Sequence, residues 1–156
     1  MRTCLDAQGP GTPGAVIRLS FDSDDHSVGD ALDQLDRALS DAGVSADLIL
    51  STRIVLAEVF NNIVEHAYGD SMDGTIAASV RPGEGGLACE IRDSGAPMPD
   101  GPLPGASYPV LDAKAPMNWP EGGFGWAMVR EMTSCLCYAR SEGENVLRFR
   151  IMAEAD

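Results

Sequence analysis

The stretch Ile54–Tyr68 constrains this chain most, because an apolar pattern and a polar pattern coincide within it. Its apolar residues recur at the spacing of one face of a buried helix; they are Ile54, Val55, Val59, Ile63 and Val64. Glu58 and Asn62 stand at i and i+4 and are neighbours on one face, with His66 one turn further along the same line. Buried polar groups without partners cost about 1–3 kcal/mol each, so this polar stripe predicts a bound ligand.

The length of the chain suits one soluble domain. Its 156 residues are 44% hydrophobic and 22% charged, which is ordinary for a globular protein with a core. Residues 1–14 are polar and rich in Gly and Pro, so we expect a disordered tail there and a single domain over residues 15–156. No apolar run approaches the roughly 18–20 residues of a membrane-spanning helix. We therefore expect a cytoplasmic protein without a membrane partner.

The charge and the cysteines exclude further classes. A net charge of −13 argues against nucleic acid as a partner, because phosphate backbones require clusters of Lys and Arg. Any phosphate bound here would need backbone N–H groups or a metal. Four cysteines are present, namely Cys4, Cys89, Cys135 and Cys137, and they lack the paired spacing of a zinc site. Cys135 and Cys137 are predicted to share one face of a strand, and we expect reduced thiols.

Periodicity and turn residues predict five strands and three helices. We expect strands over residues 15–21, 75–81, 87–92, 135–140 and 146–152, with hairpin connections at 82–86 and 141–145. The first helix should begin at a capping box of Ser27 and Asp30 and end near Gly43, with a stripe of Val28, Leu32, Leu35 and Leu39. The second should begin at a Ser45 cap and run to about Tyr68, and the third should cover 126–132.

Each remaining motif has an ordinary reading when taken alone. Residues 96–121 form a long irregular segment with seven prolines, and such segments are functional lids or disordered. The glycines of the following cluster, 122–125, suit phosphate binding before a helix, but equally a hinge. Asp93-Ser94-Gly95 alone is a plain turn. Glu58 with Asn62 also fits a solvated helix face, and His66 fits a capping or packing histidine.

The order and spacing of these motifs together resemble the GHKL ATPase superfamily, and most closely its anti-sigma-factor serine kinases of bacterial partner switching. The stretches that carry the resemblance are 58–68 (the N box), 91–99 (the G1 box), 122–130 (the G2 box) and 138–147. It extends over residues 15–152. The resemblance implies a Bergerat fold, which is a two-layer α/β sandwich. Its sheet is mixed but largely antiparallel, its helices lie on one face, and a long ATP lid corresponds here to residues 96–121.

The resemblance also implies a role for each motif residue. Asn62 would ligate Mg²⁺, Glu58 would act as the general base, and Asp93 would accept from the amino group of adenine, with Gly95 letting the backbone pass close to the base. The nucleotide would also contact His66 and the glycine-rich segment; its members are Gly122, Gly123, Phe124 and Gly125, and the backbone N–H groups of the last three would hold phosphates. Arg130 is a candidate for a phosphate contact or a structural one.

Some residues depart from the family pattern. Asn61 precedes Asn62, but the spacing from Glu58 and to His66 favours Asn62 as the metal ligand. Trp126 stands where a smaller aliphatic residue is usual, and Met132-Thr133-Ser134 stands where an acidic residue is common. None of these departures removes an implied catalytic residue.

We therefore expect a bacterial anti-sigma factor with ATP-dependent protein serine kinase activity. Its implied partners are a sigma factor and a STAS-domain antagonist, which it would phosphorylate on serine, and it would form a homodimer. Two alternatives stay open. One is a catalytically silent nucleotide-binding switch that only sequesters a partner, and the other is a histidine-kinase-like module that acts in trans.

Overall fold

The computed structural model describes residues 14–69, 73–99, 103 and 124–154. The predicted tail, apart from Gly14, lies outside the described residues, as do most of the segment 96–121 and both Gly122 and Gly123. Within the described residues, no helix is both long enough and apolar enough to cross a bilayer.

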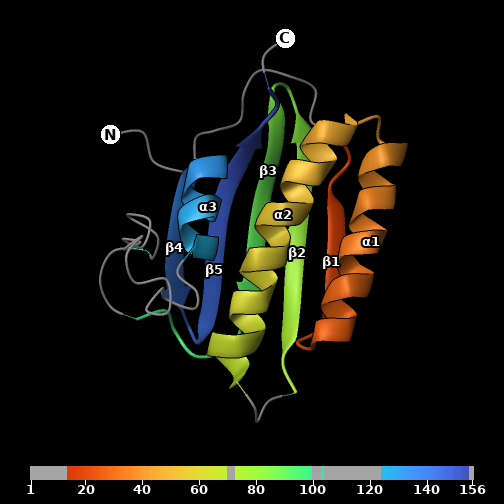
Figure 1. Cartoon of the computed structure of the whole chain (residues 1–156). Coiled ribbons are helices and arrows are strands. Elements are labelled where there is room, and N and C mark those ends of the chain that lie inside the picture. Colours follow the sequence, from red (N-terminus) through yellow and green to blue (C-terminus); the bar gives the residue numbers. More distant parts are fainter. Residues whose placement is uncertain (1–13, 70–72, 100–102, 104–123, 155–156) are drawn as a thin grey trace, which may run out of the picture.

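One layer of the fold is a five-stranded sheet (Figure 1). Its strands are β1 (Ile17–Asp22), β2 (Thr75–Gly83), β3 (Gly86–Asp93), β4 (Ser134–Ser141) and β5 (Glu144–Met152). Their spatial order is β1-β2-β3-β5-β4, and all four pairings are antiparallel. The five predicted strands are confirmed. The mixed sheet that we expected is instead wholly antiparallel between the described strands, because hairpins join β2 to β3 and β4 to β5 and β3 pairs antiparallel with β5.

Both hairpins turn more tightly than the sequence suggested. Gly83 pairs with Gly86, so only Glu84 and Gly85 connect β2 to β3, where a connection over 82–86 was expected. In the second hairpin Ser141 pairs with Glu144, and Glu142 and Gly143 have φ angles of 52° and 81°. A two-residue turn in which both central φ angles are positive has a backbone twist that matches the right-handed twist of the strands it joins. The ladder between β4 and β5 also shifts register between Ser134 and Cys137, and this irregularity breaks the predicted alternation at Cys135.

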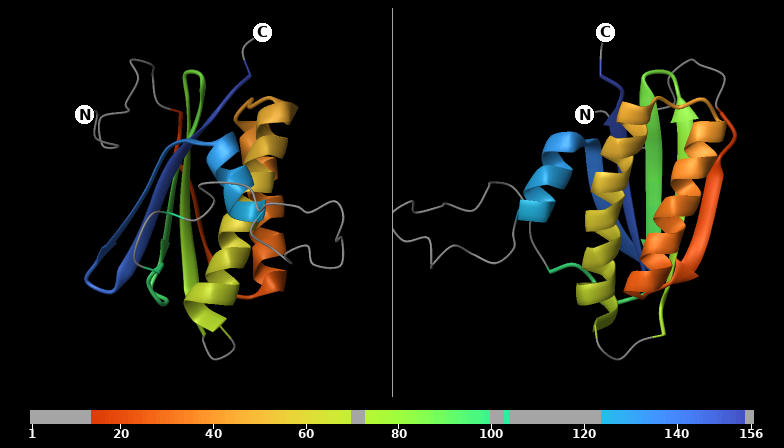
Figure 2. Two further views of the ribbon diagram at one scale, coloured as in Figure 1. Left: turned by 60° about the vertical axis from the view of Figure 1, so that its left-hand side comes forward. Right: turned by 45° about the vertical axis from the view of Figure 1, so that its right-hand side comes forward.

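The helices form the second layer on one face of the sheet (Figure 2). They are α1 (Asp25–Asp41), α2 (Ala46–Asn62), the π-helical η1 (Ile63–Tyr68) and α3 (Phe124–Met132). The Ser45 cap is confirmed, since its hydroxyl accepts from the Leu48 N–H. The predicted Ser27 cap is wrong: Asp24 caps α1 and accepts from the Ser27 N–H at 2.8 Å. The side-chain oxygen of an N-cap residue accepts from the backbone N–H three residues on, so Ser27 donates to the cap and is not the cap itself.

The core lies between the two layers. The predicted stripe on α1 is buried, and alternate residues of the strands meet it and the apolar face of α2. Phe60 of α2 is fully buried and its ring meets Phe21 of β1 edge-on at 5.0 Å between centroids. These contacts hold α2, which carries Glu58 and Asn62, against the sheet.

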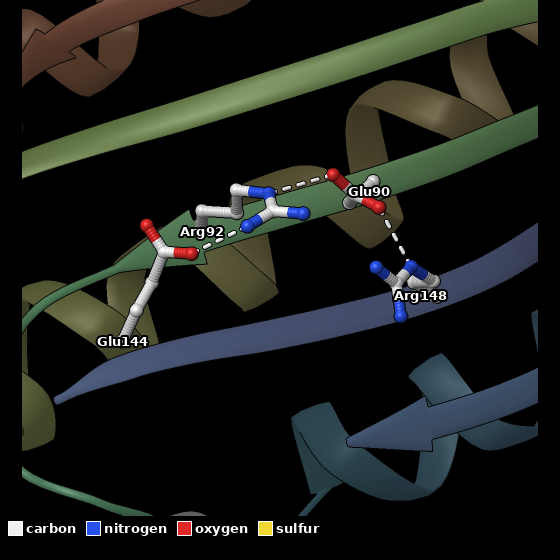
Figure 3. Close-up of polar contacts among 4 residues, drawn as sticks. All are labelled: Glu90, Arg92, Glu144 and Arg148. Carbon is white, nitrogen blue, oxygen red and sulfur yellow. Dashed lines mark hydrogen bonds and ion pairs between the residues drawn. The ribbon is translucent and has the colours of Figure 1, made fainter. Parts of the chain in front are cut away.

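The opposite face of the sheet carries charged side chains. Figure 3 shows Glu90 and Arg92 of β3 beside Arg148 of β5, on the side away from α2. Glu90 accepts from Arg92 Nε at 2.7 Å and from Arg148 Nε at 2.6 Å, and Arg92 also pairs with Glu144. Partial burial by itself raises the pKa of Glu90, but the hydrogen bonds from the two arginines outweigh it and leave that pKa below its ordinary value. The network ties β3 to β5 across the face that no described helix covers.

Candidate functional site

A cavity of about 480 Å³ opens where α2, η1 and α3 meet the sheet. This volume is typical of small-ligand sites, which span about 300–1,000 Å³. Its walls come from α2 and η1, from the end of β3 and the residues after it, from α3, and from β4 and β5. They are Val59, Asn62, Ile63, His66, Ala67, Asp93, Ala96, Pro97, Met98, Pro99, Trp126, Tyr138, Asn145 and Leu147. Among the predicted site residues that the structure describes, three line this cavity, namely Asn62, His66 and Asp93.

Asn62 is the last residue of α2 and is half-buried. Its Nδ2 donates to the Glu58 carbonyl at 2.7 Å. A carbonyl oxygen only accepts, so this bond fixes which end of the amide is the nitrogen. The side-chain oxygen is left for a ligand, and an amide oxygen suits a hard cation such as Mg²⁺. Within the described residues no cluster of three or more His, Cys, Asp or Glu side chains could hold a metal alone. A lone amide oxygen at this position would need further ligands from a bound molecule to hold a cation.

Glu58 lies one turn before Asn62, and its carboxylate lies against the start of α3. A Cβ atom placed on Gly125 would come within 2.0 Å of Glu58 Oε2. Only glycine therefore fits at position 125 while Glu58 keeps this position. Backbone N–H groups at a helix N-terminus lack helical partners and favour negative charge. The arrangement brings a carboxylate close to the start of α3, although none of Glu58, Phe124 and Gly125 lines the cavity.

The α-helix that carries Glu58 and Asn62 ends at Asn62. From Ile63 to Tyr68 the chain forms a π-helix, in which hydrogen bonds run from i to i+5. Each turn then takes more residues, but His66 still lines the same cavity as Asn62. The His66 side chain is 73% exposed at the rim of the cavity, with Glu65 3.8 Å away. The packing role considered for His66 is therefore wrong, and so is the continuous α-helix to Tyr68.

Asp93 ends β3 and is only 7% exposed. Its Oδ1 accepts from the Gly95 N–H at 2.9 Å and from Asn145 Nδ2 at 2.8 Å. No described residue donates a hydrogen bond to Oδ2. One oxygen of a nearly buried carboxylate is thus anchored, and the other can accept from a ligand in the cavity.

Gly95 packs closely against the backbone of Ala67 in η1. A Cβ there would meet the Ala67 carbonyl oxygen at 2.5 Å and the Ala67 carbonyl carbon at 2.6 Å. The Ala96 N–H donates to the same oxygen at 2.7 Å. Tyr68 supports this junction, since its hydroxyl accepts from the Ser94 N–H and donates to the Thr75 carbonyl. The glycine of the predicted G1 motif therefore lets the loop after β3 pack directly on η1.

Other predicted residues lie at the edges of the site. Arg130 of α3 donates to the Leu103 carbonyl at 2.6 Å, which is a structural contact with the segment after β3. Trp126 is half-buried and lines the cavity. Asn61 is exposed and does not line the cavity, which agrees with the choice of Asn62.

Sequence reasoning assigned no role to three side chains behind Asp93. Asn145 is 5% exposed and contacts Asp93, and Tyr138 and Arg140 both donate to Asn145 Oδ1 at 2.6 Å. The available signal was an asparagine at the end of the predicted connection 141–145, directly before the apolar residues Val146 and Leu147.

The sequence matches the family described as "Histidine kinase-like ATPase domain" over residues 21–151. No curated protein matches it significantly. Among solved structures it is similar to the RsbU and RsbW domains of Rv1364c from Mycobacterium tuberculosis, with a TM-score of 0.59 and 16% identity over 88% of this chain and 32% of that one. The histidine kinase domain of the Erythrobacter litoralis EL346 blue-light activated histidine kinase gives a TM-score of 0.48 and 17% identity, over 80% and 60% respectively. The chain thus spans about a third of the length of the first structure, and at this identity the likeness shows a shared fold.

Proposed function

We propose that this chain, which belongs to the histidine kinase-like ATPase family, is an anti-sigma factor with ATP-dependent protein serine kinase activity. Membership of the family confirms the resemblance seen in the motifs and supports assigning the cavity to a nucleotide. The anti-sigma role, the serine specificity and Mg²⁺ belong to the proposal, as do a STAS-domain antagonist as substrate, a sigma factor as partner and a homodimeric state. The combination of N-box, G1 and G2 motifs supports it.

The observation that carries the kinase proposal is the position of Glu58. Its carboxylate lies beside Gly125 at the start of α3, one helical turn from Asn62. A helix N-terminus favours phosphate, and the Asn62 oxygen suits a cation bound to that phosphate. A carboxylate in this position can accept the proton of an incoming hydroxyl. A site that only binds nucleotide has no need of that group.

Each residue then has a part in the transfer. Asn62 would hold Mg²⁺, which when bound neutralises phosphate charge. Asp93 Oδ2 would accept from the adenine amino group, and the N–H groups of Phe124 and Gly125 would face the phosphates. Glu58 would accept the serine proton while the serine oxygen bonds to the γ-phosphorus and the bond to the ADP oxygen breaks.

Calorimetry and phosphate transfer test this proposal. The chain is mixed with radiolabelled Mg-ATP and purified STAS-domain proteins from the same genome. We expect acid-stable phosphoserine on one of them. Glu58→Gln should keep ATP affinity and lose transfer by about 10²–10⁴-fold. Asn62→Ala should lose Mg²⁺-dependent ATP binding, whereas the exposed neighbour variant Asn61→Ala should bind normally.

The other outcomes identify the alternatives. Normal ATP affinity without transfer to any STAS-domain protein would identify a silent switch. Acid-labile phosphohistidine on the partner would identify a histidine-kinase-like module. Equal rates of phosphate transfer by the wild type and by Glu58→Gln would exclude Glu58 as the general base.

A further inference from the structure

Asn145 is the centre of a polar network in the wall of the proposed nucleotide cavity, which Tyr138 also lines. Its Nδ2 donates to Asp93 Oδ1 at 2.8 Å and to the Ala96 carbonyl at 3.0 Å, with a longer contact of 3.4 Å to the Gly95 carbonyl. Its Oδ1 accepts from the Tyr138 hydroxyl and from Arg140 Nη1, both at 2.6 Å. Both amide hydrogens and both oxygen lone pairs are thus used, and the residue is 5% exposed. A buried amide with every partner satisfied holds one orientation.

This orientation fixes Asp93. Asn145 and the Gly95 N–H both donate to Oδ1, so rotation of the Asp93 carboxylate would break two hydrogen bonds in a nearly buried place. The remaining oxygen is held at the cavity wall before any ligand arrives. A group that is positioned in advance loses little entropy when it binds.

The same network also fixes the wall beside Asp93. The Tyr138 hydroxyl accepts from the Met98 N–H at 3.1 Å while it donates to Asn145. Arg140 Nη1 donates to the Gly95 carbonyl at 2.9 Å. Residues 95–98 follow β3 and lie outside the described strands, so side chains of β4 and β5 position them together with the contact to η1.

We propose that Asn145 and Tyr138 are a positioning pair that sets the base selectivity of the site. This inference rests on the proposed ATP function. With Asp93 held, Oδ2 accepts a hydrogen bond from a 6-amino purine. A 6-oxo purine presents a second acceptor there, and the anchored carboxylate cannot turn away from it. A site built to hydrogen-bond one group rejects the analogue that lacks it, because its own buried group is left unpaired.

The test compares ATP with ITP, which differ at this position of the base. Calorimetry measures both affinities for the full chain, for Asn145→Ala and for Tyr138→Phe, with Asn61→Ala as the exposed asparagine control. We expect the wild type to bind ATP about 100-fold or more tightly than ITP. Asn145→Ala should lower that preference about tenfold, because the affinity for ATP falls and the affinity for ITP does not. Tyr138→Phe keeps the ring, and we expect it to lower the preference about threefold. Asn61→Ala should leave it unchanged.

The outcomes separate this inference from the proposed function. If Asn145→Ala and Tyr138→Phe weaken ATP and ITP equally, the pair is merely structural and the inference fails while the ATP site stands. If the wild type binds neither nucleotide, the proposed function and the inference fall together. Should Asn145→Ala not fold, the ratio of affinities in Tyr138→Phe decides alone.

Discussion

Gly95 and Gly29 offer opposite tests of how the site is built. A Cβ on Gly95 would lie 2.5–2.7 Å from three atoms of Ala67, two of them backbone. The main chain of η1 cannot move aside as a flexible side chain can, so Gly95→Ala should push the loop off the helix. Gly29 lies inside α1, and a Cβ there meets nothing within 4 Å.

The magnitudes follow from these contacts. Overpacking costs about 1–3 kcal/mol, and loss of the bond from the Ala96 N–H to the Ala67 carbonyl adds about 1 kcal/mol. We therefore expect Gly95→Ala to lower the free energy of unfolding by about 2–4 kcal/mol. Gly29→Ala should raise it by about 0.5–1 kcal/mol, because alanine loses less backbone entropy in a helix.

Urea unfolding followed by circular dichroism measures both changes. With an m value of about 2 kcal/mol per M, the midpoint should fall by about 1–2 M for Gly95→Ala and rise by about 0.3–0.5 M for Gly29→Ala. ATP binding should weaken in the first variant and stay unchanged in the second. A Gly95→Ala midpoint within about 0.2 M of the wild type would refute the close packing of the loop on η1.

Two further predictions concern titrating groups away from the cavity. Burial raises the pKa of the Cys89 thiol to about 12. Iodoacetamide at pH 8 should therefore label the exposed Cys135 in the folded protein and Cys89 only after unfolding, as measured by peptide mass spectrometry. Equal labelling of both cysteines in the folded protein would contradict the burial of Cys89. Glu90 has a lowered pKa in the folded state, so its contribution is complete above its unfolded pKa and is lost as the pH falls through the folded value. Glu90→Gln should therefore lower the free energy of unfolding by about 1 kcal/mol at pH 7, and the difference should shrink in acid during urea titrations. A difference that does not change with pH would exclude the ion pairs as its cause.

The elements themselves could be read from the sequence. Apolar periodicity is a local property, so the five strands and three helices appear in the predicted order. The position of the first cap was missed because Asp24 and Ser27 are both good caps, and the choice depends on where β1 ends. There the Asp24 N–H donates to the Asp22 carbonyl, and α1 begins at Asp25.

The π-helix after Asn62 could not be read from the sequence. Nothing in residues 63–68 distinguishes them from an α-helix, but the Ala67 carbonyl accepts from the Ala96 N–H and Tyr68 bonds to Ser94 and Thr75. Thr75 lies at the start of the β2–β3 hairpin, and Ser94 and Ala96 lie just after its end. Long-range contacts therefore accompany the change in helical pitch after Asn62.

Sequence alone determined the elements and the motif residues. Helix and strand patterns, like motif spacing, depend only on residues that are close together in the sequence. Only the tertiary structure decided what lies behind those motifs. Pairing of β3 with β5 sets Asp93 directly opposite Asn145, and pairing of β4 with β5 sets Arg140 opposite Asn145. Strand register depends on packing of the whole sheet against the helices, so a residue distant in sequence became the hydrogen-bond partner that orients Asp93.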